Sequence, residues 1–216
     1  MDRSLARSNI YKTLSIFFAY PNESIRSLIR NNQRQKELRE WLNMLDDEYF
    51  AGCLEDFKNA CSAGKMSGKN EMTQEYERVF SGSRSDTHNA SASSYMRDVW
   101  SVLRGKKCAA VGSYKDFGSE FKKTKRPIAD MSCHRLKLMG ILAELESKAA
   151  CIEKIRLEEI QLDFLSKFIV PCIPDFCDEL IRNSYLDFYR ALGILTREFV
   201  KFEENYLGIP EEMEKG

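Results

Sequence analysis

The sequence predicts an all-α fold, and three observations support that prediction. Apolar residues recur at intervals of three and four along most of the 216 residues, which is the spacing of one face of a helix. Glycine and proline are sparse, at 11 and 5 residues, whereas turn-rich β proteins need many of both. No alternating apolar and polar stretch of useful length indicates a strand. The chain length suits a single helical domain over 1–216, and an apolar content of 43% is sufficient for a core.

The first part of the chain predicts a succession of short helices. A helix over 5–19 places Ile10, Leu14 and Phe17 on one face and ends before Pro21. Another follows over about 24–30. Two more are expected over 35–45 and 47–61, with inward faces formed by Leu38, Trp41, Leu42, Leu45, Phe50, Leu54, Phe57 and Cys61.

Two polar stretches interrupt the helical pattern in the middle of the chain. Residues 62–70 are small and polar and predict a loop, and residues 71–80 predict a helix. Residues 81–94 have almost no apolar side chain and predict a second long loop, of a length that is usually functional or mobile. The remaining expectations here are a helix over 109–123 and basic loops at 104–107 and 122–126.

The helical pattern is strongest from Asp130 onward. Pro171 stops an apolar run and Pro174 opens the next segment, so we expect a helix, a tight corner and another helix. Apolar helical faces are expected from Leu138, Leu142, Leu145, Ala149, Ile152, Ile155, Leu162, Leu165 and Ile169, then from Phe176, Leu180 and Ile181 after the corner. The last helix is expected to carry a seam of Tyr185, Phe188, Leu192, Leu195, Phe199, Phe202 and Tyr206.

Charge and cysteine content argue against several classes of protein. The 33 basic and 33 acidic residues balance, so the whole molecule has no strong attraction for nucleic acid or an anionic membrane. No apolar run approaches the ~20 residues that span a bilayer, so we expect no stable membrane insertion. Basic residues before the apolar run 14–20 imitate a signal peptide, but the run is short and no cleavage site follows it. Seven cysteines without a CxxC pair favour the scattered reduced thiols of a cytosolic protein.

No motif for catalysis or metal binding is complete. Residues 64–70 resemble a phosphate-binding loop, but the spacing is one residue short and Asn70 replaces the hydroxyl residue. The Cys-His pair at 133–134 and the two cysteines of the corner lack the closely spaced pairs of zinc sites. His88 and His134 are the two histidines, and no nucleophile motif accompanies either. We therefore expect no catalytic residue, no metal and no cofactor.

A group of aromatic and apolar residues lies outside the predicted core seams. These residues flank the polar loop over 81–94 and the start of the helix near Asp130. Ordinary core packing is the simpler interpretation of each one. The functional interpretation is that several of them line a groove for an apolar peptide. The group consists of Tyr76, Phe80, Tyr95, Trp100 and Met131.

Three segments together resemble one family. Residues 8–21, SNIYKTLSIFFAYP, are similar to its N-terminal pattern of a tyrosine, a leucine-rich helix and a final Tyr-Pro. EYERVFSG at 75–82 is similar to its E-Y-x-R-L-F-x-G block, and 164–192 resembles its F-L-x-x-H-L-x-P-W-x-P-x-F…F-Y-x-A-L block. The family is that of the TorD/DmsD/NarJ-type chaperones, also called redox enzyme maturation proteins. The resemblance spans about 5–200.

The resemblance implies an all-helical cytoplasmic chaperone with no catalysis of its own. Such a protein binds the twin-arginine signal peptide of a molybdenum-cofactor oxidoreductase subunit and permits export only after the cofactor is inserted. Charge-assisted hydrogen bonds from the two arginines of the signal peptide to acidic residues would orient the bound peptide. The peptide-binding residues that we expect are Tyr76, Phe80, Tyr95, Trp100 and Met131 for the apolar run, Asp98 and Asp130 for the arginines, and His134.

The chain departs from the family pattern near the expected site. The Asp-His pair of the family appears here as Asp130-Met131, with His134 as the displaced candidate. The corner carries Phe168 and Cys172 where the family often has histidine and tryptophan. Two alternatives are a helical adaptor for a folded partner and, less favoured, a metal- or thiol-dependent enzyme. The long loops leave both a monomer and a domain-swapped homodimer open.

Overall fold

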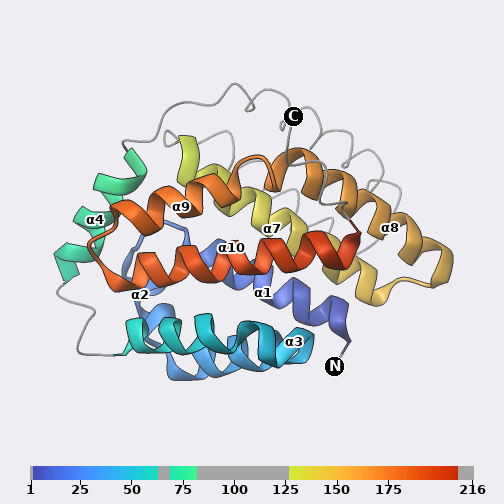
Figure 1. The fold of residues 1–216 in the computed structure, drawn as a ribbon, viewed down its shortest axis with the longest axis horizontal. Helices are drawn as coiled ribbons and strands as arrows, with labels where there is room; N and C mark the ends of the chain where they lie inside the picture. The colour runs from blue at the N-terminus through green and yellow to red at the C-terminus, as the bar shows by residue number, and fades with distance from the viewer. Residues whose placement is uncertain (1, 63–68, 82–126, 209–216) are drawn as a thin grey trace.

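The computed structural model describes residues 2–62, 69–81 and 127–208, and it places no strand among them. The all-α prediction is therefore confirmed. The helices in chain order are α1 Arg3–Phe17, α2 Glu23–Arg30, α3 Asn32–Cys61, α4 Lys69–Ser81, α7 Pro127–Lys148, α8 Cys151–Phe164, the π-helix η1 Leu165–Ile169, α9 Ile173–Asn183 and α10 Asp187–Leu207 (Figure 1). The helix predicted over 109–123, both basic loops and nearly all of the loop predicted over 81–94 lie outside the described residues.

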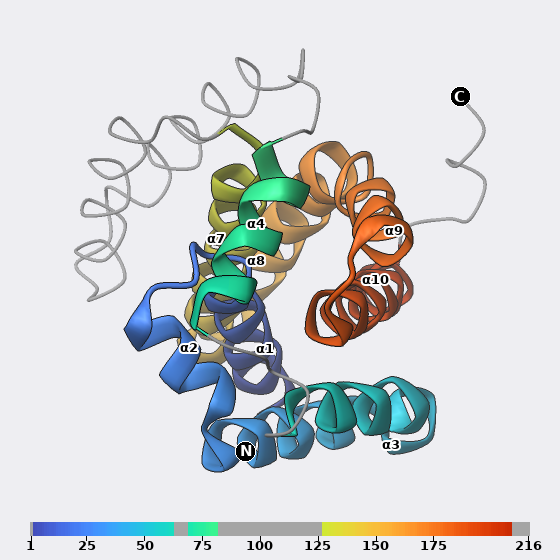
Figure 2. The same ribbon diagram turned by 90° about the vertical axis from the view of Figure 1, so that its left-hand side faces the viewer.

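Helix α1 lies at the centre of the described helices (Figure 2). It packs against α7, α3, α2 and α10. Helix α10 also packs against α9 and α3, and α7 packs against α8. The described helices share one hydrophobic cluster, so segments from both ends of the chain form the same core. The prediction of a single domain over 1–216 extends beyond these residues and stays a prediction.

Local signals set the ends of the first two helices. The Asp2 side chain accepts a hydrogen bond from the Ser4 amide at 3.4 Å and caps α1. The Asn22 side chain caps α2 by accepting from the Ile25 amide at 2.9 Å. Between the caps, Ile10 and Leu14 on α1 are fully buried. Each such side chain contributes about 1.5–3 kcal/mol to folding, so the apolar face of α1 holds the helix in the core.

Helix α3 is bent at Asp46. The backbone of Asp46 is extended there, with φ −165° and ψ 108°. The Asp46 carboxylate accepts a hydrogen bond from the Tyr49 amide at 2.9 Å, so it caps the second half of α3. The two helices predicted over 35–45 and 47–61 are thus the two halves of α3, divided at the predicted boundary.

Glycines allow two pairs of helices to approach closely. A Cβ on Gly140 of α7 would lie 2.9 Å from Lys12 Cγ and 3.1 Å from the Ser8 carbonyl oxygen of α1. The Ser8 hydroxyl donates to the Gly140 carbonyl at 2.7 Å across the same contact. A Cβ on Gly193 of α10 would lie 3.1 Å from the Cys177 carbonyl oxygen of α9. Both contacts therefore depend on the absence of a side chain.

The corner between α8 and α9 follows the two prolines, with one feature that was not predicted. The helix widens into η1 before Pro171, and the Val170 amide donates to the Leu165 carbonyl at 2.9 Å. Proline has no amide and its ring crowds the carbonyl four residues earlier, so a regular α-turn cannot continue through Pro171. Pro174 lies in the first turn of α9, as expected. A π-helix of five residues is too short to produce a repeating apolar pattern, so the sequence does not reveal it.

Three predicted core positions are wrong. The apolar spacing was expected to continue through Ile152 and Ile155, but α7 ends at Lys148 and a new helix begins at Cys151. Ile152 and Ile155 lie on the outer face of α8 and are 87% and 57% exposed. Tyr185 was placed in the last helix, but it precedes α10 and is 77% exposed. In each case the prediction continued the apolar spacing across the end of a helix, and the next helix has a different buried face.

One smaller boundary also differs. The loop predicted over 62–70 is shorter at its end, because α4 already begins at Lys69. The six described cysteines form no disulfide, which agrees with the prediction of reduced thiols.

Candidate functional site

The structure describes only part of the predicted peptide-binding set. Tyr95, Asp98 and Trp100 lie outside the described residues. Asp130 and Met131 lie in the first turns of α7, where the structure describes the backbone but not these side chains. Tyr76 and Phe80 on α4 and the half-buried His134 on α7 are described in full.

Tyr76 and Phe80 belong to the core in the described conformation. They are 1% and 6% exposed, and their rings stack with centroids 4.2 Å apart. Phe80 also packs against Phe176 of α9 at 5.5 Å and against Tyr189 of α10 at 5.7 Å. A peptide on the surface therefore does not reach these two rings unless α4 shifts.

The charged residues of the same motif fasten α4 to the turn between α9 and α10. We call Glu75, Arg78, Asn183 and Tyr185 the α4 clamp. Arg78 donates to both carboxylate oxygens of Glu75, each at 2.8 Å, and to the Asn183 carbonyl at 2.5 Å. The Tyr185 amide donates to Glu75 at 2.5 Å. In the EYERVF segment, the charged Glu75 and Arg78 therefore attach α4 to its neighbours, and the rings of Tyr76 and Phe80 pack in the core.

Part of the α4 clamp faces solvent. The guanidinium of Arg78 lies 4.2 Å from the centroid of the Tyr185 ring, a cation–π contact. On the other side of α4, the Tyr20 hydroxyl lies 3.5 Å from Glu77, and the Tyr20 ring meets Tyr76 edge-on at 5.5 Å. Two exposed tyrosines therefore flank α4, one from the connection after α1 and one from the turn before α10.

The Glu75 carboxyl is ionised more easily than a free glutamate. Burial alone raises the pKa of Glu75, but hydrogen bonds from Arg78 and from the Tyr185 and Leu186 amides outweigh burial and lower that pKa below its ordinary value of 4.5. The α4 clamp is therefore charged and closed at neutral pH.

The most deeply buried charges were missed by sequence reasoning. Arg7 of α1 is fully buried, and its Nε and Nη2 donate to the two carboxylate oxygens of Glu203 of α10 at 2.7 Å each. Its Nη1 donates to Glu146 of α7 at 2.8 Å, and Nη2 also donates to Gln161 of α8 at 3.0 Å. Four helices meet at this arginine.

The remaining acceptors of this network are also occupied. The hydroxyls of Ser4 and Tyr11 donate to Glu146 at 2.5 Å and to Glu203 at 3.0 Å. Burial lowers the pKa of Arg7, but the two carboxylates outweigh that effect and raise it, so Arg7 is charged. The guanidinium of Arg7 and the carboxylates of Glu146 and Glu203 all have hydrogen-bond partners within the protein. The network is therefore suited to holding helices together rather than to binding a substrate.

Nothing in the described residues resembles a metal or nucleophile site. No group of three or more His, Cys, Asp or Glu side chains among them could hold a metal ion. Burial raises the pKa of the Cys61 thiol to about 12 and that of Cys53, which also lies near Glu198, to about 11. Burial raises the pKa of Cys177 as well. Thiols of this kind carry little thiolate at neutral pH and are poor nucleophiles.

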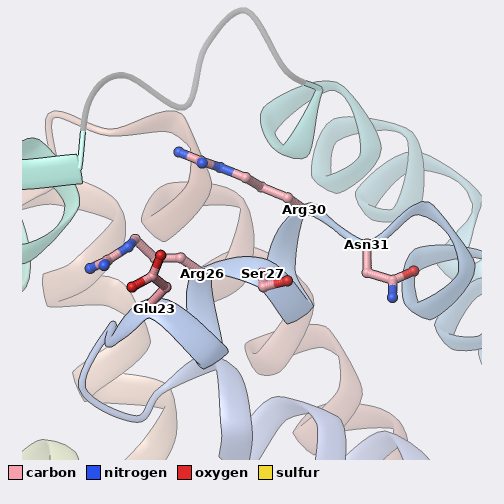
Figure 3. Close-up of a pocket in the computed structure, with 5 residues that line it drawn as sticks. All are labelled: Glu23, Arg26, Ser27, Arg30 and Asn31. Atoms are coloured by element: carbon pink, nitrogen blue, oxygen red, sulfur yellow. The ribbon is translucent and has the colours of Figure 1, made fainter.

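A hollow of about 470 Å³ lies along α2, where Glu23, Arg26, Ser27, Arg30 and Asn31 line it (Figure 3). Arg26 and Arg30 both extend from this helix, with Glu23 beside Arg26. Arg26 is already engaged by the Pro21 carbonyl and lies 3.5 Å from the Thr73 hydroxyl. Because Arg26 is engaged in this way, the hollow does not present a converging set of free polar groups.

The described charged clusters, the α4 clamp and the Arg7 network, attach helices to one another in an all-helical fold. The family model described as nitrate reductase delta subunit matches residues 31–178, which is more than half of the chain. The protein therefore belongs to the nitrate reductase delta subunit family, which is of the NarJ/TorD chaperone type. The resemblance drawn from the sequence is thereby confirmed. No curated protein matches the chain.

Family membership makes the protein a maturation chaperone of molybdenum enzymes rather than a member of a catalytic family. The match includes the EYERVF segment and the start of α9, but not residues 8–21. Within the described ranges, no helix has the length and apolarity required to cross a membrane.

Proposed function

We propose that the protein is a cytoplasmic chaperone that binds the twin-arginine signal peptide, or the cofactor-free form, of a molybdenum-cofactor oxidoreductase subunit. In this role it assists cofactor insertion and prevents premature export. The observation that carries the proposal is the family match over residues 31–178. The all-helical fold of the described residues is consistent with it.

The affinity that such a role needs is physically reasonable. A signal peptide presents a short apolar run beside two arginines. Burial of about 400 Å² of apolar surface contributes roughly 10 kcal/mol before any costs. Association and ordering of a flexible peptide offset much of that, which leaves binding near the micromolar range. Such binding shields the peptide and still permits its release.

The proposed peptide contacts belong to residues 76–100 and 130–134. In this proposal Asp98 and Asp130 pair with the arginines, the apolar run meets Tyr76, Phe80, Tyr95, Trp100 and Met131, and His134 is a further contact. Tyr76 and Phe80 are buried in the described conformation, so their part in binding requires α4 to move. The α4 clamp is what such a movement has to open, because Arg78 is bonded to the Asn183 carbonyl and Glu75 to the Tyr185 amide.

Titration calorimetry with a twin-arginine leader peptide tests the proposal. We expect micromolar binding of the leader and a loss of at least tenfold when both arginines of the peptide are replaced by lysine, because a lysine cannot form the bidentate pair. Asp98→Asn and Asp130→Asn should each weaken the leader and leave the twin-lysine peptide almost unaffected. Asp47→Asn, on the exposed surface of α3, is the matched control.

The same titration separates the proposal from the adaptor alternative. An adaptor binds its partner equally well with and without the leader. Equal affinity for the two forms of a client subunit, together with unchanged binding in both Asp98→Asn and Asp130→Asn, contradicts the signal-peptide role and the assigned acids.

A further inference from the structure

Arg135 of α7 is a buried arginine whose charge is not neutralised by any described residue. It is 4% exposed, and its Nε and Nη2 are buried with no hydrogen-bond partner in the part of the chain that the structure describes. Among the residues that the structure describes, no carboxylate forms an ion pair with it. A buried charge without a partner is costly, and native proteins retain one mainly where something else completes it.

The third nitrogen of Arg135 contacts the corner between α8 and α9. Nη1 donates to Cys172 Sγ at 2.6 Å, and Sγ in turn donates to the Phe168 carbonyl at 3.1 Å. Sulfur is a weak hydrogen-bond acceptor. Cys172 therefore orients the guanidinium through Nη1, and Nε and Nη2 stay unpaired among the described residues.

The unfilled atoms of Arg135 form one defined edge of the guanidinium. The Nε–H and Nη2–H bonds of an arginine run parallel on the same side, which matches the two oxygens of a carboxylate. Arg7 of the same protein shows that edge occupied, since its Nε and Nη2 each lie 2.7 Å from an oxygen of Glu203. In Arg135 no described residue accepts a hydrogen bond from the same pair of donors.

The surroundings hold this edge in a fixed position. Arg135 is buried on α7, and the adjacent Leu136 is fully buried. Its sulfur contact comes from the corner directly after η1, and Phe168 belongs to η1 itself. π-Turns are frequent at functional sites, where they position side chains that a regular helix would not.

We propose that the Nε–Nη2 edge of Arg135 is a binding site for a carboxylate, held as a bidentate pair at the junction of α7, η1 and the corner. The carboxylate belongs either to a small free anion or to an acidic side chain of a bound polypeptide, and the recognition chemistry is the same for both. The site is independent of the signal-peptide contacts proposed above, which use acids to bind arginines.

Thermal unfolding of the full chain in sodium formate, compared with sodium chloride at equal ionic strength, tests the site. Formate is the smallest carboxylate and suits a buried position. A ligand that binds only the folded state raises Tm, by about 3–6 °C at ten times its Kd for a chain of this size. We expect this shift in the natural protein, no shift in Arg135→Met, and only a small part of it in Arg135→Lys, which keeps the charge but not the edge.

An amidated and acetylated glycine–aspartate–glycine tripeptide, with its asparagine counterpart as control, distinguishes the two sources. A response to formate alone assigns the site to a small anion. A response to the aspartate peptide and not to the asparagine peptide assigns it to an acidic polypeptide, and both results support the proposal. Equal shifts in the natural protein and Arg135→Met, or no shift with either probe, overturn it.

The ligand-free stability of the same variants supplies a second readout. An uncompensated buried charge destabilises the fold, so Arg135→Met in chloride should unfold at or above the Tm of the natural protein. Arg7→Met should lower Tm strongly, because it leaves Glu203 and Glu146 buried without their cation. If Arg135→Met lowers Tm as much as Arg7→Met, a carboxylate of the chain itself already fills the edge and the proposal fails.

Discussion

Arg7 and Glu203 form a two-bond ion pair in the centre of the protein, although 196 residues separate them in the chain. Both side chains are fully shielded from solvent. The pair joins α1 to α10, and Glu146 extends it to α7. The first and the last helices of the described chain are therefore attached to each other by a specific contact as well as by apolar packing.

Removal of the Arg7 guanidinium should strongly destabilise the fold. Arg7→Met leaves two buried carboxylates without their cation, and breaking a buried pair in this way costs about 3–5 kcal/mol. Urea unfolding followed by circular dichroism measures the loss. Arg39→Met is the control, because Arg39 pairs with Glu55 on the surface at 3.7 Å and should cost less than about 1 kcal/mol. Similar losses for the two variants contradict the central role of the network.

Two glycine-to-alanine changes should have opposite effects. Gly140→Ala places a methyl group against the α1 backbone at 3.1 Å, and such overpacking costs about 1–3 kcal/mol. Gly52→Ala meets nothing within 4 Å and lies inside α3, so the gain in helix propensity should stabilise the fold by about 0.5–1 kcal/mol. A pair of unfolding curves decides the matter, and a destabilising Gly52→Ala or a neutral Gly140→Ala is inconsistent with the packing described.

The attachment of α4 should weaken in acid. The folded-state pKa of Glu75 is lower than its unfolded value, so its contribution to stability is complete above about pH 4.5 and is lost as pH falls through the lower folded pKa. Unfolding free energies measured from pH 7 down to pH 3 should decline less steeply for Glu75→Gln than for the natural chain. Glu55→Gln, in an exposed pair, serves as the reference. Parallel pH profiles for Glu75→Gln and the natural chain would show that the α4 clamp contributes nothing.

Alkylation should distinguish the cysteines by their burial. Raised pKa values leave Cys53 and Cys61 protonated, and Cys177 is fully buried as well. Cys151 is exposed at the start of α8. Brief treatment with iodoacetamide at pH 8, followed by mass spectrometry, should label Cys151 and spare the other three until urea is added. Rapid labelling of Cys177 in the folded protein would mean that α9 does not pack as described.

Helical spacing was sufficient for the fold because apolar residues form the core wherever a helix is continuous. Ile10 and Leu14 on α1, and Leu195 and Phe199 on α10, are buried as their spacing predicts. The predicted division of α3 also falls at its kink. The prediction was wrong at Ile152, because it continued the spacing of α7 into the separate helix α8, where Ile152 is exposed.

The buried charges were harder to predict, because their partners are far apart in sequence. A signal was nevertheless present in the register. Arg7 precedes Ile10 and Leu14 by three and seven residues, so it lies on the apolar face of α1. Glu203 follows Phe199 by four on α10, and Arg135 precedes Leu138 and Leu142 by three and seven on α7. A charge at an apolar register position indicates a buried pair or a ligand site, although spacing alone does not identify the partner.

The interpretation of EYERVF changed most between sequence and structure. The sequence makes Tyr76 and Phe80 candidate groove residues. In the described conformation they are core residues of a helix that Glu75 and Arg78 attach to the α9–α10 turn. Of the other predicted contacts, Tyr95, Asp98 and Trp100 lie outside the described residues, and these three stay predictions together with Asp130, Met131 and His134.

The most direct test of the chaperone role is to identify by mass what co-purifies with the tagged protein from its native host. The proposal predicts a molybdenum-cofactor oxidoreductase subunit in stoichiometric amount, lacking its cofactor and retaining an uncleaved twin-arginine leader. Asp130→Asn should reduce its recovery and Asp47→Asn should not. Recovery of only mature, cofactor-loaded enzyme, or of no oxidoreductase subunit at all, contradicts the proposed function.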